Sequence, residues 1–157
     1  LPPGATARAE HARLLREELG AAFGTDLSEV STTEMMDSIE YFLFPNAFFF
    51  PGISIRLCYR FRPLGPDECL HEILVLQPLP ADGERPAPAT PIRLGVEDSY
   101  TTVPGFALAE ILDQDTDNLI LQQEGLEASA KHGLTLGDYQ EIRIRQFHQT
   151  LDKYLNA

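Results

Sequence analysis

Cysteine and basic residues are scarce in this chain of 157 residues. Cys58 and Cys69 are the only two cysteines, so the sequence does not imply a disulfide framework. Lys and Arg together number 12, against 24 Asp and Glu, and the formal net charge is −12. Because phosphate binding depends on clustered Lys and Arg, this charge argues against a nucleic-acid or an anionic-membrane partner.

Long apolar runs are also missing. No run approaches the roughly 20 residues that span a bilayer, and the longest apolar stretch, residues 41–51, is interrupted by Pro45 and Asn46. The sequence shows no signal peptide. We therefore expect a soluble, cytoplasmic protein with no membrane partner. Hydrophobic residues make up 43% of the chain, which is enough for the packed core of one domain, residues 1–157.

The order of predicted elements is a helix, then antiparallel strands, then long helices. Residues 5–23 are rich in Ala, Leu, Glu and Arg, which favours a helix, and Gly24 lies where a C-cap glycine belongs. Residues 30–78 are dense in β-branched and aromatic residues with a periodicity near two, which favours strands. This order predicts an α+β fold. The later residues predict a surface loop over 78–91, a short strand within 92–102, and helices over about 116–131 and 136–155.

Residues 53–61 and 69–77 predict an antiparallel pair of strands. A Pro- and Gly-containing turn over residues 63–67 joins them. Acidic and basic side chains then lie on facing strands, where a cross-strand pair contributes about 0.2–1 kcal/mol. We expect Glu68 and Glu72 to lie across from Arg60 and Arg56.

The stretch over residues 108–126 places one carboxylate on an otherwise apolar helical stripe. At about 100° per residue, one face collects Leu108, Leu112, Asp115, Leu119, Gln122 and Leu126. Asp113 and Asp117 point the opposite way and can stay in water. We therefore expect Asp115 to face the core, where an unpaired carboxylate is costly and needs a cation or hydrogen-bond donors.

Three interpretations of Asp115 remain open on spacing alone. It can be the N-cap of a helix over residues 116–131, with its carboxylate accepting backbone N–H groups. It can pair with an arginine of the upstream strands. It can also be a ligand of a metal ion.

Three blocks of the sequence, taken in order, favour the metal ligand. They resemble the catalytic large subunits of Rieske non-heme iron oxygenases, the aromatic-ring-hydroxylating dioxygenases and related monooxygenases. The similarity spans about residues 31–155. The blocks are Phe44-Pro45-Asn46 with the segment Tyr59–Asp67, the acidic motif Asp113–Asn118 with Gln123 and Gly125-Leu126, and the final segment from Gln140-Glu141 through Arg145–His148.

The resemblance implies a mononuclear Fe(II) site with two histidines and one aspartate. Neutral imidazoles and a carboxylate suit ferrous iron, and open coordination positions suit dioxygen. Asp115 matches the carboxylate, and Gln114 beside it can orient it by donating a hydrogen bond. The two histidines belong to a segment that we do not find in this chain, and His11, His71, His132 and His148 do not match them.

An electron-donating [2Fe–2S] cluster is expected in the parent protein and not in this chain. Such a cluster needs a Cys-x-His and a Cys-x-x-His motif. Cys69-Leu70-His71 has the first spacing, but no second motif follows. By resemblance, the partners of the chain are the remainder of the oxygenase subunit and a reductase or ferredoxin.

The substrate implied by the resemblance is an aromatic or related apolar small molecule. The family lines its cavity with residues around the Phe-Pro-Asn block and just before the iron aspartate. The matching positions in this sequence are Ser38, Glu40, Phe50, Ile53 and Ile111. An ordinary core role for Phe50, Ile53 and Ile111 remains equally open.

The family fold implied is a helix-grip (START-like) unit, in which a curved antiparallel sheet grips a long helix. The chain begins at Leu1, which suggests a cut, processed or engineered start. We expect it to hold only the later strands and closing helices of the catalytic domain, with an open sheet edge that promotes oligomerisation. Our main hypothesis is part of a ring-hydroxylating oxygenase that acts in aromatic hydrocarbon catabolism. The alternative is a non-catalytic helix-grip-like module that binds a small molecule.

Overall fold

Helix α1 (Ala7–Phe23) opens the fold, and both of its ends are capped by sequence-local signals. The computed structural model describes residues 1–76, 84–131 and 133–157. The side chain of Thr6 accepts a hydrogen bond from the Ala9 backbone N–H at 3.2 Å, as an N-cap threonine does. Gly24 ends the helix in the left-handed conformation, with φ 62°. The helix predicted over residues 5–23 is confirmed within two residues at its start.

Helix α2 (Thr32–Met36) is short and begins with a capping box. The Ser31 hydroxyl accepts a hydrogen bond from the Glu34 backbone N–H, and the Glu34 carboxylate accepts one from the Ser31 N–H at 3.0 Å. Met35 is fully buried in this region. The segment before α2 is held to α1, because Arg16 Nε donates to the Val30 carbonyl oxygen at 2.7 Å.

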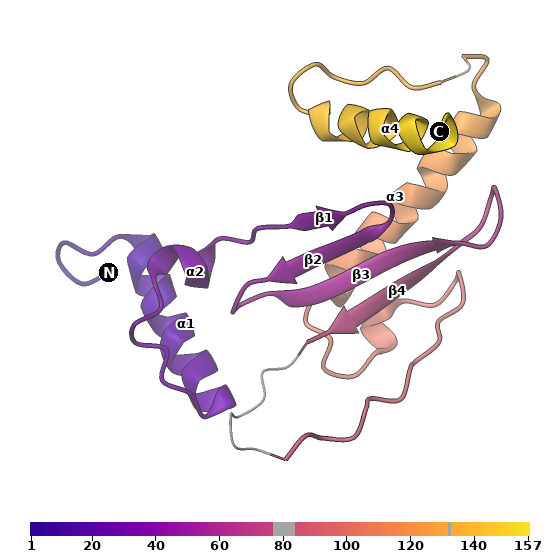
Figure 1. Cartoon of the computed structure of the whole chain (residues 1–157). Helices are drawn as coiled ribbons and strands as arrows, with labels where there is room; N and C mark the ends of the chain where they lie inside the picture. Colours follow the sequence, from indigo (N-terminus) through magenta and orange to yellow (C-terminus); the bar gives the residue numbers. More distant parts are fainter. Residues whose placement is uncertain (77–83, 132) are drawn as a thin grey trace. The chain divides into compact units, whose positions relative to one another are not determined.

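Four strands follow as an antiparallel meander (Figure 1). The spatial order equals the chain order, and each strand pairs antiparallel with the next. The sheet confirms the strands predicted within residues 30–78, although Gln77 lies outside the described residues. The strands are β1 (Tyr41–Leu43), β2 (Ala47–Pro51), β3 (Arg56–Pro63) and β4 (Cys69–Val75).

The register between β3 and β4 differs from the predicted one. Arg60 lies opposite Glu72, not Glu68, and Arg60 Nε donates to Glu72 Oε2 at 2.7 Å. The predicted pairing of Arg56 with Glu72 is therefore wrong. The reason is that β3 continues through Pro63. The missing backbone N–H of Pro63 is tolerated there, because Pro63 lies beyond the last residue of β3 that pairs with β2.

Because directly opposite residues share a face, the register defines two faces of the sheet. The Tyr59 face consists of Phe42, Phe48, Phe50, Leu57, Tyr59, Phe61, Pro63, Cys69, His71, Ile73 and Val75. The Phe49 face consists of Tyr41, Leu43, Ala47, Phe49, Pro51, Arg56, Cys58, Arg60, Arg62, Leu70, Glu72 and Leu74.

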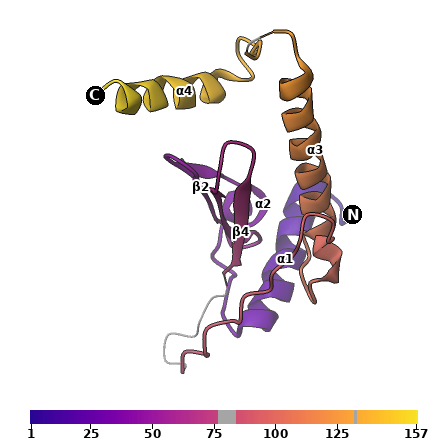
Figure 2. The same cartoon turned by 90° about the vertical axis from the view of Figure 1, so that its right-hand side faces the viewer.

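After the sheet, the described residues from 84 to 99 form no helix or strand, so the short strand predicted within 92–102 is wrong. Instead, a 3-10 turn η1 (Tyr100–Thr102) precedes helix α3 (Ala109–Ala128). Figure 2 shows α3 as one continuous helix. It begins seven residues before the predicted residue 116, because Ala109–Leu112 already forms its first turn. The last helix is α4 (Ile142–Leu155), which begins six residues after the predicted start at 136.

The chain divides into two compact units, residues 1–86 with 149–157, and residues 87–148. The elements give an α+β fold with an open antiparallel sheet, as predicted. Gripping of a helix by the sheet stays a prediction. No helix among the described residues is long and apolar enough to cross a membrane.

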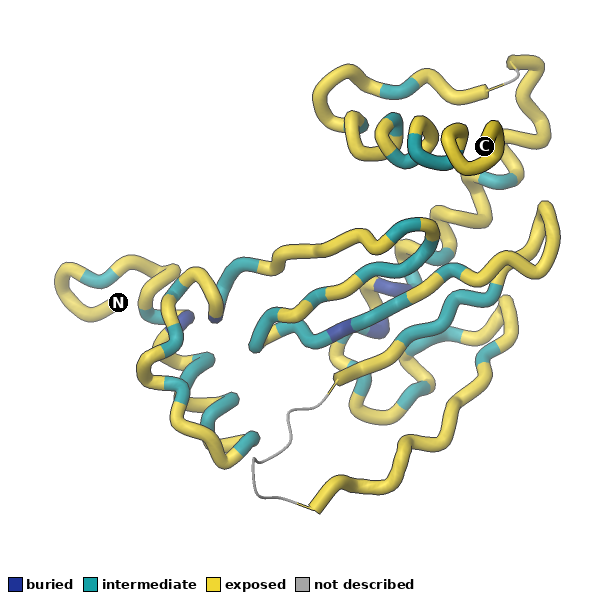
Figure 3. Tube along the Cα trace, viewed as in Figure 1, coloured by how far each residue is buried: buried dark blue, intermediate teal, exposed yellow. Residues whose placement is uncertain are grey.

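Burial is concentrated in few places (Figure 3). Within the described ranges, the residues classed as buried are all apolar, and they are Ala12, Met35, Leu57, Ala109 and Leu112. Many large apolar side chains remain exposed, among them Leu119 at 49% and Leu121 at 64%. The apolar stripe of residues 108–126 is therefore buried only where α3 begins.

Candidate functional site

Asp115 lies in the second turn of α3 and is exposed. The expectation that it faces the core is wrong. Leu112 at 7% exposure is the buried member of its stripe, whereas Leu119 is 49% exposed. The helical period identified the stripe correctly, but only the first part of the stripe is covered.

Asp113 is the acid of the motif whose carboxylate makes tertiary hydrogen bonds, although it was expected to stay in water. Its Oδ2 accepts a hydrogen bond from the Ser99 hydroxyl at 2.5 Å, and its Oδ1 accepts one from the Tyr100 backbone N–H at 2.7 Å. The Ser99 hydroxyl, the Tyr100 N–H and the Thr101 N–H lower the pKa of the Asp113 carboxyl. This half-buried carboxylate therefore joins η1 to α3.

One of the three interpretations of Asp115 fails on this geometry. It is not an N-cap, because α3 begins at Ala109. Within the second unit, no described residue forms an ion pair or a hydrogen bond with its side chain, and pairing with an arginine of the upstream strands stays a prediction. The carboxylate is consequently free to bind a ligand, as is that of the exposed Asp117.

The residues around Asp115 on α3 are exposed as well. Gln114, proposed to orient Asp115, is exposed and its side chain makes no hydrogen bond within the described residues. Ile111 lies one turn before Asp115 and is 56% exposed. Ile111, Asp115 and Leu119 thus form an exposed line along α3 at a spacing of four residues.

The other predicted substrate residues belong to the first unit, and two of them meet at Tyr59. The Tyr59 hydroxyl donates a hydrogen bond to Glu40 Oε1. The Phe50 ring lies 6.0 Å from the Tyr59 ring, centroid to centroid. Ser38 is exposed after α2, and Ile53 is half-buried in the turn between β2 and β3.

Tyr59 is the residue that sequence reasoning missed here. It was placed on a strand face but not among the site residues. It also stacks on Phe48, at 4.9 Å between ring centroids, and lies near the Phe61 and His71 rings. The signal was the alternation of Leu57, Tyr59 and Phe61, which puts Tyr59 on the same face as Phe50 once the register is known.

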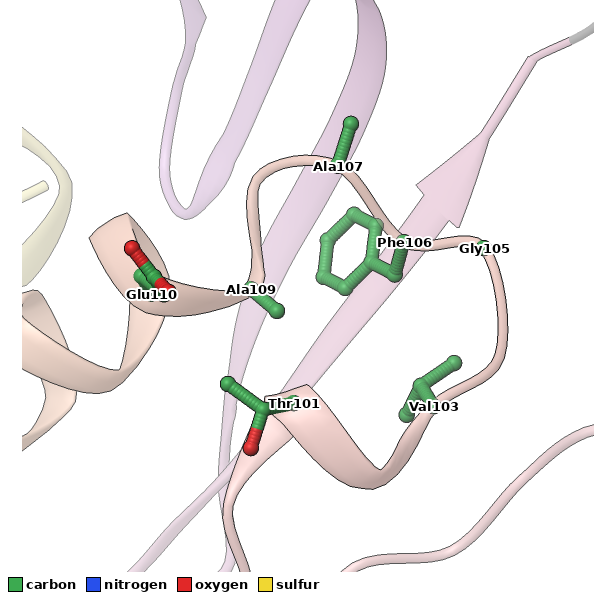
Figure 4. A pocket seen from close by; sticks show the side chains of 7 residues that line it. All are labelled: Thr101, Val103, Gly105, Phe106, Ala107, Ala109 and Glu110. Carbon is green, nitrogen blue, oxygen red and sulfur yellow. The ribbon is translucent and has the colours of Figure 1, made fainter.

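A separate open pocket of about 570 Å³ lies in the second unit (Figure 4). The residues that line it come from η1, the loop after it and the first turn of α3. Most are apolar, while a hydroxyl and a carboxylate add polar groups. The lining residues are Thr101, Val103, Gly105, Phe106, Ala107, Ala109 and Glu110. They differ from the predicted substrate residues.

The described residues contain no group of three or more His, Cys, Asp or Glu side chains placed to hold a metal ion. His71 stacks on Phe61 at 4.4 Å, on the Tyr59 face. His11 lies in α1 and His148 in α4. His132 lies outside the described residues.

Comparison with known families identifies the class of the chain. Its α+β elements place strands first and then an acidic motif on a long helix. Residues 8–157 match the family described as ring hydroxylating alpha subunit (catalytic domain). The chain belongs to this family. Comparisons with curated proteins and with solved structures give no match.

Membership of this family implies a non-heme iron catalytic site, an aromatic substrate and an oligomeric oxygenase with reductase or ferredoxin partners. The described residues do not by themselves fit the iron. Asp115 offers one free carboxylate of the right type, but no further donors are gathered in the described ranges. A facial set of two histidines and one carboxylate is therefore not completed by them.

Proposed function

We propose that this chain is part of the catalytic domain of a Rieske-type ring-hydroxylating oxygenase, which hydroxylates an aromatic or related apolar substrate with O₂. In this proposal Asp115 is one ligand of a mononuclear Fe(II) ion, and two histidines come from a segment outside this chain. The parent protein would carry a [2Fe–2S] cluster, receive electrons from a reductase or ferredoxin and work in the cytoplasm. The single observation that carries the proposal is the family match over residues 8–157.

The assignment of Asp115 is supported by the different states of the three nearby acids. Asp113 is engaged by Ser99 and Tyr100, so binding a metal ion would compete with the contacts that join η1 to α3. Asp115 is exposed and makes no side-chain contact of this kind within the described residues. Asp117 is the structural rival, because it is exposed too. The position of Asp115 within the family motif favours it over Asp117.

The proposed contribution to substrate binding comes from the Tyr59 face. Its half-buried aromatic rings offer apolar surface and ring edges to a flat apolar molecule. Glu40 and Phe50 both contact Tyr59, so Tyr59 can hold these two predicted substrate residues in place. Ser38, Ile53 and Ile111 complete the proposed substrate set, with Gln114 beside the metal ligand.

The experiment that tests the proposal uses the parent protein, identified by extending the reading frame around this sequence. Asp115→Ala removes a ligand and a negative charge that favours the ferrous ion. We expect mononuclear iron and product formation to fall to background, while reduction of the [2Fe–2S] cluster survives because its ligands are elsewhere. Asp117→Ala is the matched control and should keep both iron and turnover.

Two outcomes would contradict the proposal. If Asp117→Ala lost the iron while Asp115→Ala kept it, the assignment of the motif would be wrong. If the reading frame held no paired histidines and no cluster motif, the chain would instead suit the alternative, a non-catalytic helix-grip-like module that binds a small molecule.

A further inference from the structure

The four strands divide their charged side chains unequally between the two faces of the sheet. Adjacent residues of a strand point to opposite faces, so the alternation of the sequence decides which face each charge occupies. All the Lys, Arg, Asp and Glu side chains of the strands belong to the Phe49 face, and they are Arg56, Arg60, Arg62 and Glu72. A molecule that approaches the Tyr59 face therefore meets no arginine or lysine of the strands.

Glu40 supplies a carboxylate beside the Tyr59 face. It directly precedes β1, and the Tyr59 hydroxyl donates a hydrogen bond to its Oε1. No described residue of the first unit forms an ion pair with Glu40, and none of them donates a hydrogen bond to its Oε2. Tyr59 thus orients the carboxylate, while one of its oxygens remains able to accept a donor.

Aromatic rings form the surface next to this carboxylate. The Tyr59 ring lies 6.0 Å from the Phe50 ring and 4.9 Å from the Phe48 ring, centroid to centroid. The Phe42 ring continues the surface at 4.9 Å from Phe48, and Phe42 is 43% exposed. Aromatic rings attract cations through the negative charge of their faces, whereas aliphatic side chains do not. The surface is therefore apolar and compatible with a positive charge.

The charge of the bound molecule decides how well it suits this surface. An anionic arene would be repelled by Glu40 and would find no arginine or lysine of the strands on this face. A neutral arene would cover the carboxylate and take it out of water without a partner, which is costly. A molecule with a cationic nitrogen pairs with the carboxylate, and its apolar body covers the rings.

His71 is the one strand side chain of the Tyr59 face that can gain a positive charge. It lies on β4, and its ring stacks on Phe61 at 4.4 Å. Glu40 precedes β1, at the opposite edge of the sheet. An assay at about pH 8, well above the ordinary histidine pKa of about 6.5, keeps a histidine cation from competing with the ligand.

We propose that the substrate of the Tyr59 face is an aromatic or related apolar molecule that carries a cationic nitrogen, a protonated amine or a quaternary ammonium group, bound by the Glu40 carboxylate. This rests on the proposed function, in which Glu40 and Phe50 belong to the substrate set, and it narrows the substrate class. Tyr59 is the positioning residue, because its hydroxyl holds Glu40 while its ring joins the aromatic surface.

The test compares two probes of the same shape, phenyltrimethylammonium and tert-butylbenzene, which differ in one atom and in charge. Binding of each probe to the purified chain is titrated by NMR in sealed tubes at about pH 8. We expect the cation to bind at least about fivefold more tightly than the neutral probe. This measurement needs no iron, so it is independent of oxygenase activity.

Three variants assign the preference to the site, and circular dichroism checks that each one folds. Glu40→Gln should abolish the preference without weakening the neutral probe. Glu68→Gln is the matched control, because it removes the same charge from an exposed residue just before β4, at the other end of the strands. It should keep the preference, which separates Glu40 from the overall negative charge. Tyr59→Phe keeps the ring, removes the hydroxyl and should lower the preference in part.

Several outcomes would contradict the proposal. Equal binding of the two probes, tighter binding of the neutral probe, no binding of either, or a preference that survives Glu40→Gln would overturn it. An unchanged preference in Tyr59→Phe would refute the positioning role of Tyr59. Failure of the proposed function would appear in a different measurement, as iron and turnover that survive Asp115→Ala in the parent protein, whatever the two probes do.

Discussion

The carboxylate of Asp113 on α3 binds Ser99, accepting a hydrogen bond from its hydroxyl at 2.5 Å. Asp115, two residues further along the same helix, is exposed and has no comparable contact among the described residues. Asp113 and Asp115, two acids of one short motif, therefore differ in burial and in hydrogen bonding. Asp113 holds the fold, and Asp115 remains available for a ligand.

Replacing Asp113 should loosen η1. In Asp113→Ala the Ser99 hydroxyl and the Tyr100 N–H lose their acceptor, and a donor left without its partner destabilises the local structure. We expect a lower melting temperature and faster hydrogen exchange at the Tyr100 amide, followed by mass spectrometry or NMR. Asp117→Ala, which removes an exposed carboxylate of the same helix, should change neither. Unchanged exchange at Tyr100 would show that other contacts hold η1.

The parts of the fold that the sequence predicted well depend on local signals. Gly24 marks the end of α1 because the left-handed conformation favours glycine. Alternating apolar residues and the turn at Pro63–Asp67 marked β3 and β4, although the register was displaced because β3 runs on through Pro63. Such signals involve residues close in the chain, so one sequence is enough to read them.

The state of the acidic motif depends on contacts that are distant in the chain. The partner of Asp113 is Ser99, on a different element, and no periodicity connects the two. The stripe through Leu112 and Leu119 predicted a covered face, but coverage ends after the first turn of α3. Helical phase says which residues share a face, and tertiary packing decides how much of that face is buried.

Met35 should contribute strongly to stability. It is fully buried in α2, so Met35→Ala leaves a cavity and should lower the free energy of unfolding by about 2–5 kcal/mol. Urea denaturation measures this difference. Met36→Ala is the matched control, because Met36 is the neighbouring residue and is half-buried, and it should cost clearly less. Equal losses would mean that the burial of Met35 is not maintained in solution.

Glu34 should make stability depend on pH in the acidic range. The Ser31 hydroxyl, at 2.6 Å, and the Ser31 backbone N–H donate to its carboxylate and lower the pKa of Glu34. A carboxyl whose pKa is lower in the folded state stabilises the fold above its unfolded-state pKa of about 4.3. This contribution is lost as the pH falls through the folded-state pKa.

Glu34→Gln should therefore reduce the free energy of unfolding at neutral pH, and the difference from wild type should shrink below about pH 4. Urea titrations between neutral and acidic pH measure it. Glu29→Gln is the control, since Glu29 is exposed and its side chain has no hydrogen bond within the described residues. A Glu34→Gln difference that grows on acidification would contradict the sign of the pKa shift.

The chain alone should bind divalent metal ions weakly. One carboxylate, Asp115, cannot offset dehydration of Fe(II) or Co(II) without imidazole ligands, and the described residues gather no further donors. Calorimetry with Co(II), and with Fe(II) under argon, should show binding weaker than about 1 µM, with the same heats in wild type, Asp115→Ala and Asp117→Ala. Suppose instead that one-to-one binding were tight, lost in Asp115→Ala and kept in Asp117→Ala. The histidines of this chain would then complete the site, and the proposal that its other ligands come from another segment would be wrong.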